Sequence, residues 1–240
     1  MTIYAIGDLH LPGGDVKPMD VFGPHWERHF ERICEDWRTR VKAEDVVLLP
    51  GDLSWAMRME DALMDLREIG ALPGRKILLK GNHDFWWSSI SRLRGALPDG
   101  MYALQNDCVQ IDETVFCGSR GWALPGQENG EQDVKIYNRE LMRLEMALKA
   151  ARTAAPQGRL IAMMHYPPLL SSGEDTGFTT LMERYRASDV VYGHLHGQGI
   201  RGAFQGERRG VRYHLTSCDA LGFKLYELPL CGQENEKTNS

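Results

Sequence analysis

Histidine, aspartate and asparagine side chains gather directly after short apolar runs of the sequence. Five of the eight histidines lie in these positions. Turn capping does not require such a load of imidazole and carboxylate, whereas open α/β sheets build their sites at the carboxyl ends of strands. The five segments are Gly7-Asp8-Leu9-His10, Gly51-Asp52, Gly81-Asn82-His83-Asp84, His165-Tyr166-Pro167 and Gly193-His194-Leu195-His196.

These side chains have the chemistry of metal ligands. Neutral imidazole and carboxylate commonly bind first-row divalent ions, and none of the five cysteines lies in the segments, which disfavours a structural zinc site. A carboxylate can bridge two ions, so the number of candidates favours a metal pair about 3.5–4 Å apart. The candidate ligands are Asp8, His10, Asp52, Asn82, His165, His194 and His196.

The elements that position these residues alternate between strand-like and helix-like segments, as is typical of an α/β fold. The strand-like runs are continuously apolar, which indicates strands buried on both faces. The expected strands are Thr2–Ile6, Asp45–Leu49, Lys76–Leu79, short strands from Tyr102 to Cys117, Leu160–Met164, Asp189–Tyr192, Ile200–Gln205, Val211–Thr216 and Phe223–Leu228. The expected helices are His25–Val41, Met59–Ile69, Trp86–Leu97, Val134–Ala155 and Phe178–Tyr185.

Taken together, the five segments resemble the calcineurin-like metallophosphoesterases. The matching motifs are D-x-H, G-D, G-N-H-[DE], a lone histidine and G-H-x-H, in the order of the family and between residues 8 and 196. The resemblance implies a four-layer α/β/β/α sandwich of two mixed sheets flanked by helices, with a metal pair at the strand ends.

The resemblance also implies a role for each residue. One ion would be held by Asp8, His10 and His196, and the other by Asn82, His165 and His194, with Asp52 bridging them. His83 would be a histidine near the leaving group that does not bind metal. Asp84 would orient the ring of His83.

The expected activity is metal-dependent hydrolysis of a small or nucleotide-like phosphomonoester or phosphodiester. Two divalent ions, of Mn, Fe, Zn, Co or Mg, would lower the pKa of a bridging water from ~15.7 toward 7, and the resulting hydroxide would attack in line with the leaving oxygen. A histidine beside a carboxylate could protonate that oxygen. The alternative is a non-catalytic metal-binding scaffold on the same fold, but the presence of every ligand favours the enzyme.

The residues after Gly51-Asp52 differ from the protein Ser/Thr phosphatase branch, which continues with Asp-Arg-Gly. Here Leu53 and Ser54 follow, so protein phosphatase activity is not expected. Other residues near the motifs have two interpretations each. Trp55, Trp86, Trp87 and Trp122 could stack on substrate or pack in the core, and Arg120 and Arg139 could bind phosphate or form surface ion pairs. Substrate specificity is expected from the loops Trp122–Gln132 and Pro167–Gly177.

The composition limits the partners. The chain has 240 residues, 28 Lys+Arg, 33 Asp+Glu and 42% hydrophobic residues, which suits one domain over residues 1–231 with a polar tail at 232–240. Its net charge of −5 argues against long nucleic acids and leaves a small phosphorylated substrate. Without an apolar run of ~20 residues, a signal peptide or a C-x-x-C pair, we expect a cytoplasmic protein with no membrane partner. The oligomeric state stays open.

Overall fold

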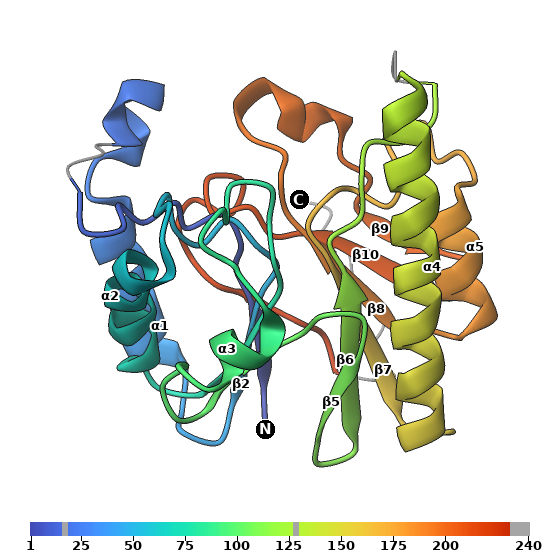
Figure 1. Cartoon of the computed structure of the whole chain (residues 1–240), viewed down its shortest axis with the longest axis horizontal. Helices are drawn as coiled ribbons and strands as arrows, with labels where there is room; N and C mark the ends of the chain where they lie inside the picture. Colours follow the sequence, from blue (N-terminus) through green and yellow to red (C-terminus); the bar gives the residue numbers. More distant parts are fainter. Residues whose placement is uncertain (16–18, 127–129, 231–240) are drawn as a thin grey trace, which may run out of the picture.

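Two mixed β-sheets stand face to face in the computed structural model, which describes residues 1–15, 19–126 and 130–230 (Figure 1). The first sheet has the order β11-β1-β2-β3-β4, in which β1 to β4 run parallel and β11 is antiparallel to β1. Its strands are β1 (Ile3–Ala5), β2 (Val46–Leu49), β3 (Arg75–Leu78), β4 (Met101–Ala103) and β11 (Tyr226–Glu227).

The second sheet has the order β5-β6-β7-β8-β10-β9. Its four central strands are parallel, and β5 and β9 form antiparallel edges. Its strands are β5 (Cys108–Ile111), β6 (Thr114–Ser119), β7 (Arg159–Met164), β8 (Asp189–Tyr192), β9 (Gly206–Arg208) and β10 (Val211–Leu215).

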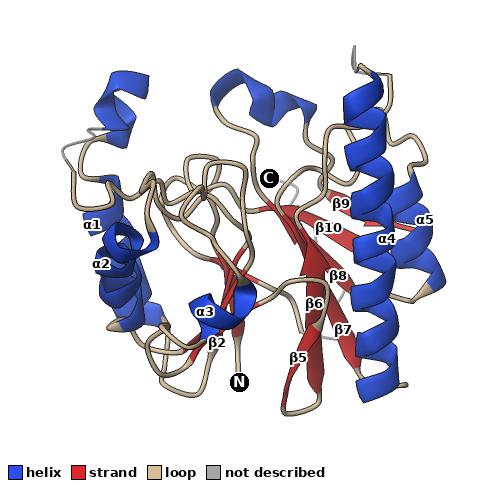
Figure 2. Ribbon diagram, in the orientation of Figure 1, coloured by secondary structure: helices blue, strands red, loops and turns tan. Residues whose placement is uncertain are grey.

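Helices cover both outer faces of the paired sheets (Figure 2). Figure 1 shows α1 and α2 on one side and α4 and α5 on the other. The helices are α1 (His29–Arg40), α2 (Met59–Gly70), α3 (Ile90–Arg94), α4 (Glu131–Ala154) and α5 (Gly177–Arg184), with short 3-10 helices η1 (Met19–Phe22), η2 (Pro24–Trp26) and η3 (Gly197–Gly202). Among the described residues, none of the helices combines the length and the apolar character needed to cross a bilayer.

Three apolar layers hold the four structural layers together. Val46 and Leu48 of β2 point into a core between the two sheets, together with Phe116 of β6. The alternate residue Val47 points to a second core beneath α1 and α2, and a third core lies beneath α4 and α5. Strands that are apolar on both faces are the physical reason for the sandwich. The predicted four-layer α/β/β/α fold is confirmed.

Two predicted elements are wrong. The helix expected over Trp86–Leu97 is limited to Ile90–Arg94, because Ser89 caps the helix by accepting from Arg92 N at 3.4 Å. The strand expected over Ile200–Gln205 is replaced by the 3-10 helix Gly197–Gly202, whose glycines weaken a strand.

Other bounds differ by a few residues. The helix expected from His25 begins at His29, and the strand expected from Phe223 is reduced to Tyr226–Glu227. The polar tail at 232–240 and part of the expected loop Trp122–Gln132 lie outside the described residues.

Candidate metal centre

Loops from both sheets meet at the carboxyl ends of the parallel strands. Asp8 N, after β1, donates to Gly51 O, after β2, at 2.9 Å. Gly7 N donates to Thr216 O at 2.7 Å, which joins the end of β1 to the end of β10 in the second sheet. From β8, His194 N donates to the Asp8 carboxylate at 3.1 Å. These contacts bring residues from distant parts of the sequence to one edge.

Carboxylate and imidazole groups form two compact sets at this edge. Asp8, His10 and His196 each offer an atom, and the three atoms lie within 4.8 Å of one another. Asp8, Asp52 and His165 meet the same criterion. Asp8 belongs to both sets, so the two sets are contiguous.

Asn82 completes the cluster between two histidine rings. Its Oδ1 lies 2.6 Å from His165 Nε2 and 2.9 Å from His194 Nδ1, and these two nitrogens are 3.3 Å apart. Asp52 Oδ2 lies 3.5 Å from His165 Nε2. The structure therefore brings together all seven candidate ligands.

Hydrogen bonds orient two of the rings toward the centre of the cluster. His165 Nδ1 lies 3.0 Å from Pro50 O, and a proton on Nδ1, donated to this carbonyl, would leave the Nε2 lone pair for a metal ion. His196 Nδ1 lies 2.8 Å from Asp219 Oδ1, and Asp219 Oδ2 accepts from Gly197 N at 3.0 Å. A metal-binding histidine is commonly held by such an outer partner.

Two buried ring nitrogens in the cluster show whether its residues fit metal ions, because each is available to bind one. His10 Nδ1 and His196 Nε2 have no hydrogen-bond partner among residues 1–15, 19–126 and 130–230. An unsatisfied buried polar atom costs about 1–3 kcal/mol, and a cation would satisfy both. The donor set of imidazole, carboxylate and amide oxygen suits Mn, Fe, Zn or Co. The residues therefore fit a metal centre.

The electrostatics of the cluster also suit cations. Burial lowers the pKa values of His10 and His165 to about 3, so both rings are neutral near pH 7, as metal binding requires. Burial, together with the carboxylates of Asp84 and Asp8, raises the pKa of Asp52 to about 8. A divalent ion among these carboxylates would favour their ionised forms.

Comparison with known proteins agrees with this geometry. A sequence model of the calcineurin-like phosphoesterases matches residues 1–198. The chain belongs to this family. Family membership and the cluster together support metal-dependent phosphoester hydrolysis in general terms. Nothing in the match points to the protein Ser/Thr phosphatase branch.

Among solved structures, one similar chain is described as "The Crystal Structure of the Protein of Unknown Function AQ665 from Aquifex aeolicus". It is 17% identical with a TM-score of 0.49, over 94% of this chain and 95% of that chain. A comparison with curated proteins found no match.

Four candidate ligands of this calcineurin-like phosphoesterase have a left-handed backbone conformation. Asp8, His10, Asp52 and His194 have φ values of 59°, 48°, 53° and 73°. Residues other than glycine rarely adopt this left-handed conformation, which costs of order 1–3 kcal/mol and tends to persist at functional sites. At each of these positions the backbone turns sharply after a strand, which directs the candidate ligand atoms toward the cluster.

Glycines make room for the two central carboxylates. A Cβ atom on Gly81 would overlap Asp52 Oδ1, and one on Gly193 would overlap Asp8 Oδ2. Neither overlap could be relieved without moving a candidate ligand. These positions require glycine for close approach.

The structure corrects the role expected for Asp84. Both carboxylate oxygens are occupied by nitrogen donors rather than by the ring of His83. The donors are the backbone N–H groups of Asp52, Leu53, Ser54 and Gly81 and the indole of Trp86. Asp84 thus holds the loop that carries Asp52. The backbone N–H of His83 donates to Asp52 Oδ1 at 2.8 Å.

His83 faces an aromatic pocket beside the cluster. The rings of Trp55 and His10 stack with centroids 4.7 Å apart, and Trp55 lies 4.5 Å from the ring of His83. Trp26 of η2 lies 5.8 Å from the ring of His196. The cavity has a volume of about 350 Å³. We call it the aromatic pocket; its lining includes His10, Phe22, Trp26, Trp55, His83 and His196.

The remaining tryptophans have other positions. Trp86 is buried and donates to Asp84, so it is a core residue. Trp87 donates to Gln105 Oε1 at 3.3 Å and lines a separate cavity. Trp122 donates to Asp133 Oδ1 at 3.1 Å. Of the four tryptophans, Trp55 is the one that contacts the rings of His10 and His83.

The sequence prediction missed Asp219, which lies at the end of β10. The same signal applied to the five other strands, a polar residue soon after a buried strand, could have found it. Three residues, Thr216-Ser217-Cys218, separate Asp219 from the strand. Its importance depends on the hydrogen bond to His196, which the sequence does not show.

Proposed function

We propose that this protein is a dimetal phosphohydrolase acting on a small or nucleotide-like phosphomonoester or phosphodiester. The observation that carries the proposal is the convergence of candidate metal-ligating side chains with two buried ring nitrogens, His10 Nδ1 and His196 Nε2, that have no hydrogen-bond partner in the described chain. His196 Nε2 lies 3.5 Å from Asp8 Oδ1. Structural packing does not account for such nitrogens, whereas a metal ion would.

The proposed ligands divide into two groups, and Asp52 would be shared by both. Asp8, His10 and His196 would hold one ion, in keeping with the first compact set. Asn82, His165 and His194 would hold the other, since their ligand atoms lie within 3.3 Å of one another. Asp52 faces His165 and would bridge the two ions.

When bound, the two ions supply Lewis-acid activation of water and of the phosphoryl group. The remaining work belongs to side chains. His83 lines the aromatic pocket, so an ester group in that pocket would present its leaving oxygen to the imidazole for protonation. The ring of Trp55 positions His83 and excludes water from one side of it.

The substrate proposal follows from the pocket. Trp26 and Trp55 line the cavity, the partly exposed ring of Trp55 offers a surface on which a flat group can stack, and the volume of about 350 Å³ is large enough for a small ester group. A cytoplasmic location is proposed because the four described cysteines, Cys34, Cys108, Cys117 and Cys218, are free thiols. One domain over residues 1–231 is proposed because β10 and β11, beyond the matched range, complete the two sheets.

A panel of substrates tests the proposal. The protein would be supplied with Mn²⁺, Co²⁺, Mg²⁺ or Zn²⁺ and assayed with an aryl phosphate, a bis-aryl phosphate, a cyclic nucleotide and a nucleoside diphosphate. We expect metal-dependent turnover of at least one monoester or diester, lowered ~10²-fold or more in Asp52→Asn. Tight metal binding without hydrolysis of any of them would instead support the non-catalytic scaffold.

A further inference from the structure

A second cavity lies next to the metal centre and shares no residue with the aromatic pocket. It has a volume of about 240 Å³ and is bounded by residues after β3, residues after β6 and one face of α4. Lys80 precedes the Gly81-Asn82 segment directly, and the backbone N–H groups of His165 and Tyr166 both donate to Arg120 O. The walls of this cavity are therefore continuous with the ligand loops.

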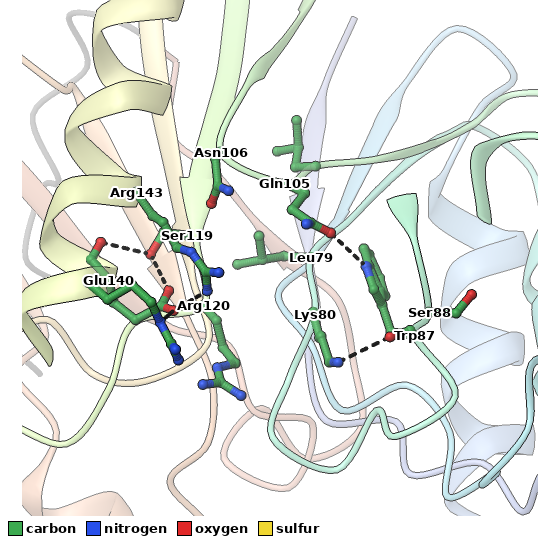
Figure 3. A pocket seen from close by; sticks show the side chains of 12 residues that line it. Leu79, Lys80, Trp87, Ser88, Gln105, Asn106, Ser119, Arg120, Glu140 and Arg143 are labelled. Atoms are coloured by element: carbon green, nitrogen blue, oxygen red, sulfur yellow. Dashed lines mark hydrogen bonds and ion pairs between the residues drawn. The ribbon is translucent and has the colours of Figure 1, made fainter. Parts of the chain in front are cut away.

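The cavity is lined by an excess of positive charge. Figure 3 shows Lys80 and Trp87 on one wall, facing Arg120, Arg143 and Glu140 on the other. Arg139 also lines the cavity. Four cationic side chains and one carboxylate thus line the cavity. We call this feature the cationic cavity, defined by Lys80, Arg120, Arg139, Glu140 and Arg143.

The one carboxylate is already engaged. Glu140 is buried, lies 2.6 Å from Arg143 NH1 and accepts from Ser119 Oγ at 3.0 Å. Arg139 Nε lies 3.9 Å from the same carboxylate and is half exposed. Glu140 can therefore neutralise one arginine well and a second one weakly.

Lys80 and Arg120 are the two cations of the cavity that form no close ion pair in the described chain, although Glu140 and Asp84 act on them from a longer distance. In the part of the chain that the structure describes, no carboxylate oxygen lies within 4.0 Å of either. Lys80 Nζ donates to Trp87 O at 3.2 Å, and the Arg120 guanidinium lies 4.7 Å from the centroid of the Trp122 ring. Both side chains are half-buried, so water screens their mutual repulsion only in part.

We propose that the cationic cavity binds an oxyanion that the substrate carries in addition to the phosphoryl group at the metal centre. The assignment of this oxyanion to the substrate rests on the proposed function. A guanidinium and an ammonium facing each other across a small cavity match a phosphate or a carboxylate, and the planar guanidinium can bind either through two hydrogen bonds. The substrate would then have its leaving group in the aromatic pocket and its second anion against Lys80 and Arg120.

Anion binding to the metal-free protein tests the site without any hydrolysis. The chelator-treated protein would be titrated by calorimetry with inorganic phosphate and, separately, with succinate, which distinguishes a phosphate site from a carboxylate site. We expect at least one of these anions to bind, and Arg120→Ala or Lys80→Met to weaken that binding about tenfold, as loss of one charge-assisted hydrogen bond should. The matched control is Arg92→Ala, whose side chain pairs with Glu60 on the surface. Thermal unfolding of each variant would check that it folds.

The outcomes separate the two proposals. No binding of either anion by the wild-type protein, or equal binding by wild type and both variants, would overturn the cationic cavity as an anion site. With the metal-loaded enzyme, Arg120→Ala should raise KM about tenfold for a phosphodiester with a carboxylate or phosphate on its non-leaving arm, and leave KM unchanged for one without it. Equal effects on both substrates would overturn the substrate assignment. If no ester is hydrolysed while the variants still lose anion binding, the proposed function fails but the anion site stands.

Discussion

Removing the carboxylate of Asp219 should weaken metal binding without removing any metal ligand. Asp219 Oδ1 lies 2.8 Å from His196 Nδ1, and its other oxygen accepts from Gly197 N at 3.0 Å. Burial by itself would lower the pKa of His196, but the carboxylates of Asp219 and Asp8 outweigh it and raise that pKa to about 10. Asp219 therefore fixes both the ring orientation and the proton of His196, which leaves Nε2 to face Asp8.

The size of the effect follows from this geometry. Loss of an outer partner of a metal-binding histidine typically costs 10- to 100-fold in metal affinity, or ~1.4–2.8 kcal/mol. Asp219→Asn keeps an acceptor and the shape but loses the charge, so we expect about tenfold. Asp219→Ala loses both, so we expect up to about 100-fold.

Competition with a chromophoric chelator would measure the affinity for Mn²⁺ or Zn²⁺. The control is Asp112→Asn, in an exposed turn with φ 51°, which asparagine tolerates. Unfolding of the metal-free variants would exclude a general loss of structure. If Asp219→Ala bound metal as tightly as the wild type, the orientation of His196 by Asp219 would be refuted.

Three further predictions follow from the same structure. His83→Ala should lower kcat ~10²-fold with unchanged metal content, as loss of a general acid does; an unchanged kcat would remove that role. Gly81→Ala should lose metal affinity because its Cβ would overlap Asp52, whereas Gly202→Ala, with open space around the site of the new Cβ, should not; calorimetry with Mn²⁺ compares them. Asp189 is buried, and hydrogen bonds from His214 and two arginines outweigh burial and hold its pKa well below its usual range. A depressed folded pKa gives stability that is present above pH ~4 and lost as pH falls below it. Asp189→Asn should therefore lower the unfolding free energy by about 3 kcal/mol at pH 7 and flatten its decline in acid; urea unfolding at pH 7 and pH 3 would show whether both effects occur.

The candidate ligand cluster could be predicted from the sequence because the residue types and their positions after apolar runs both indicate a site at the strand ends. Asp8, Asn82 and His165 directly follow or lie within a few residues of apolar runs that the structure confirms as strands. Parallel strands place their carboxyl ends at one edge, so side chains far apart in the sequence had to meet. The family match and the two observed sheets confirm the α/β fold that the residue pattern indicates and the four-layer sandwich that the family resemblance implies.

Roles that depend on one hydrogen bond could not be predicted. Asp84 follows His83 directly, and proximity suggested a contact with its ring, but the carboxylate instead accepts from the backbone around Asp52. The position of Asp219 soon after β10 could have drawn attention to it, but its role depends on the hydrogen bond to His196, which the sequence does not show. The hydrogen-bond partner of each carboxylate depends on the direction of its side chain in the folded loop.

The failed secondary-structure predictions have similar local causes. The spacing of Trp86, Ile90 and Leu93 fits a helical face, yet the indole of Trp86 donates to Asp84 and the helix starts only after the Ser89 cap. The apolar residues near Ile200 fit a strand, but the glycines at 197 and 199 favour a 3-10 turn that follows the candidate ligand His196. In both places a local signal, the Ser89 cap or the glycines, decides the element.

The most direct test of a dimetal phosphohydrolase is turnover of an aryl phosphate measured against the number of metal ions bound per chain. Chelator-treated protein would be reloaded stepwise with Mn²⁺, with bound metal determined by mass spectrometry at each step. The proposed function predicts no turnover without metal and a maximum when two ions are bound. Full activity in the presence of chelator, or two bound ions with no turnover of any phosphomonoester or phosphodiester, would contradict the account.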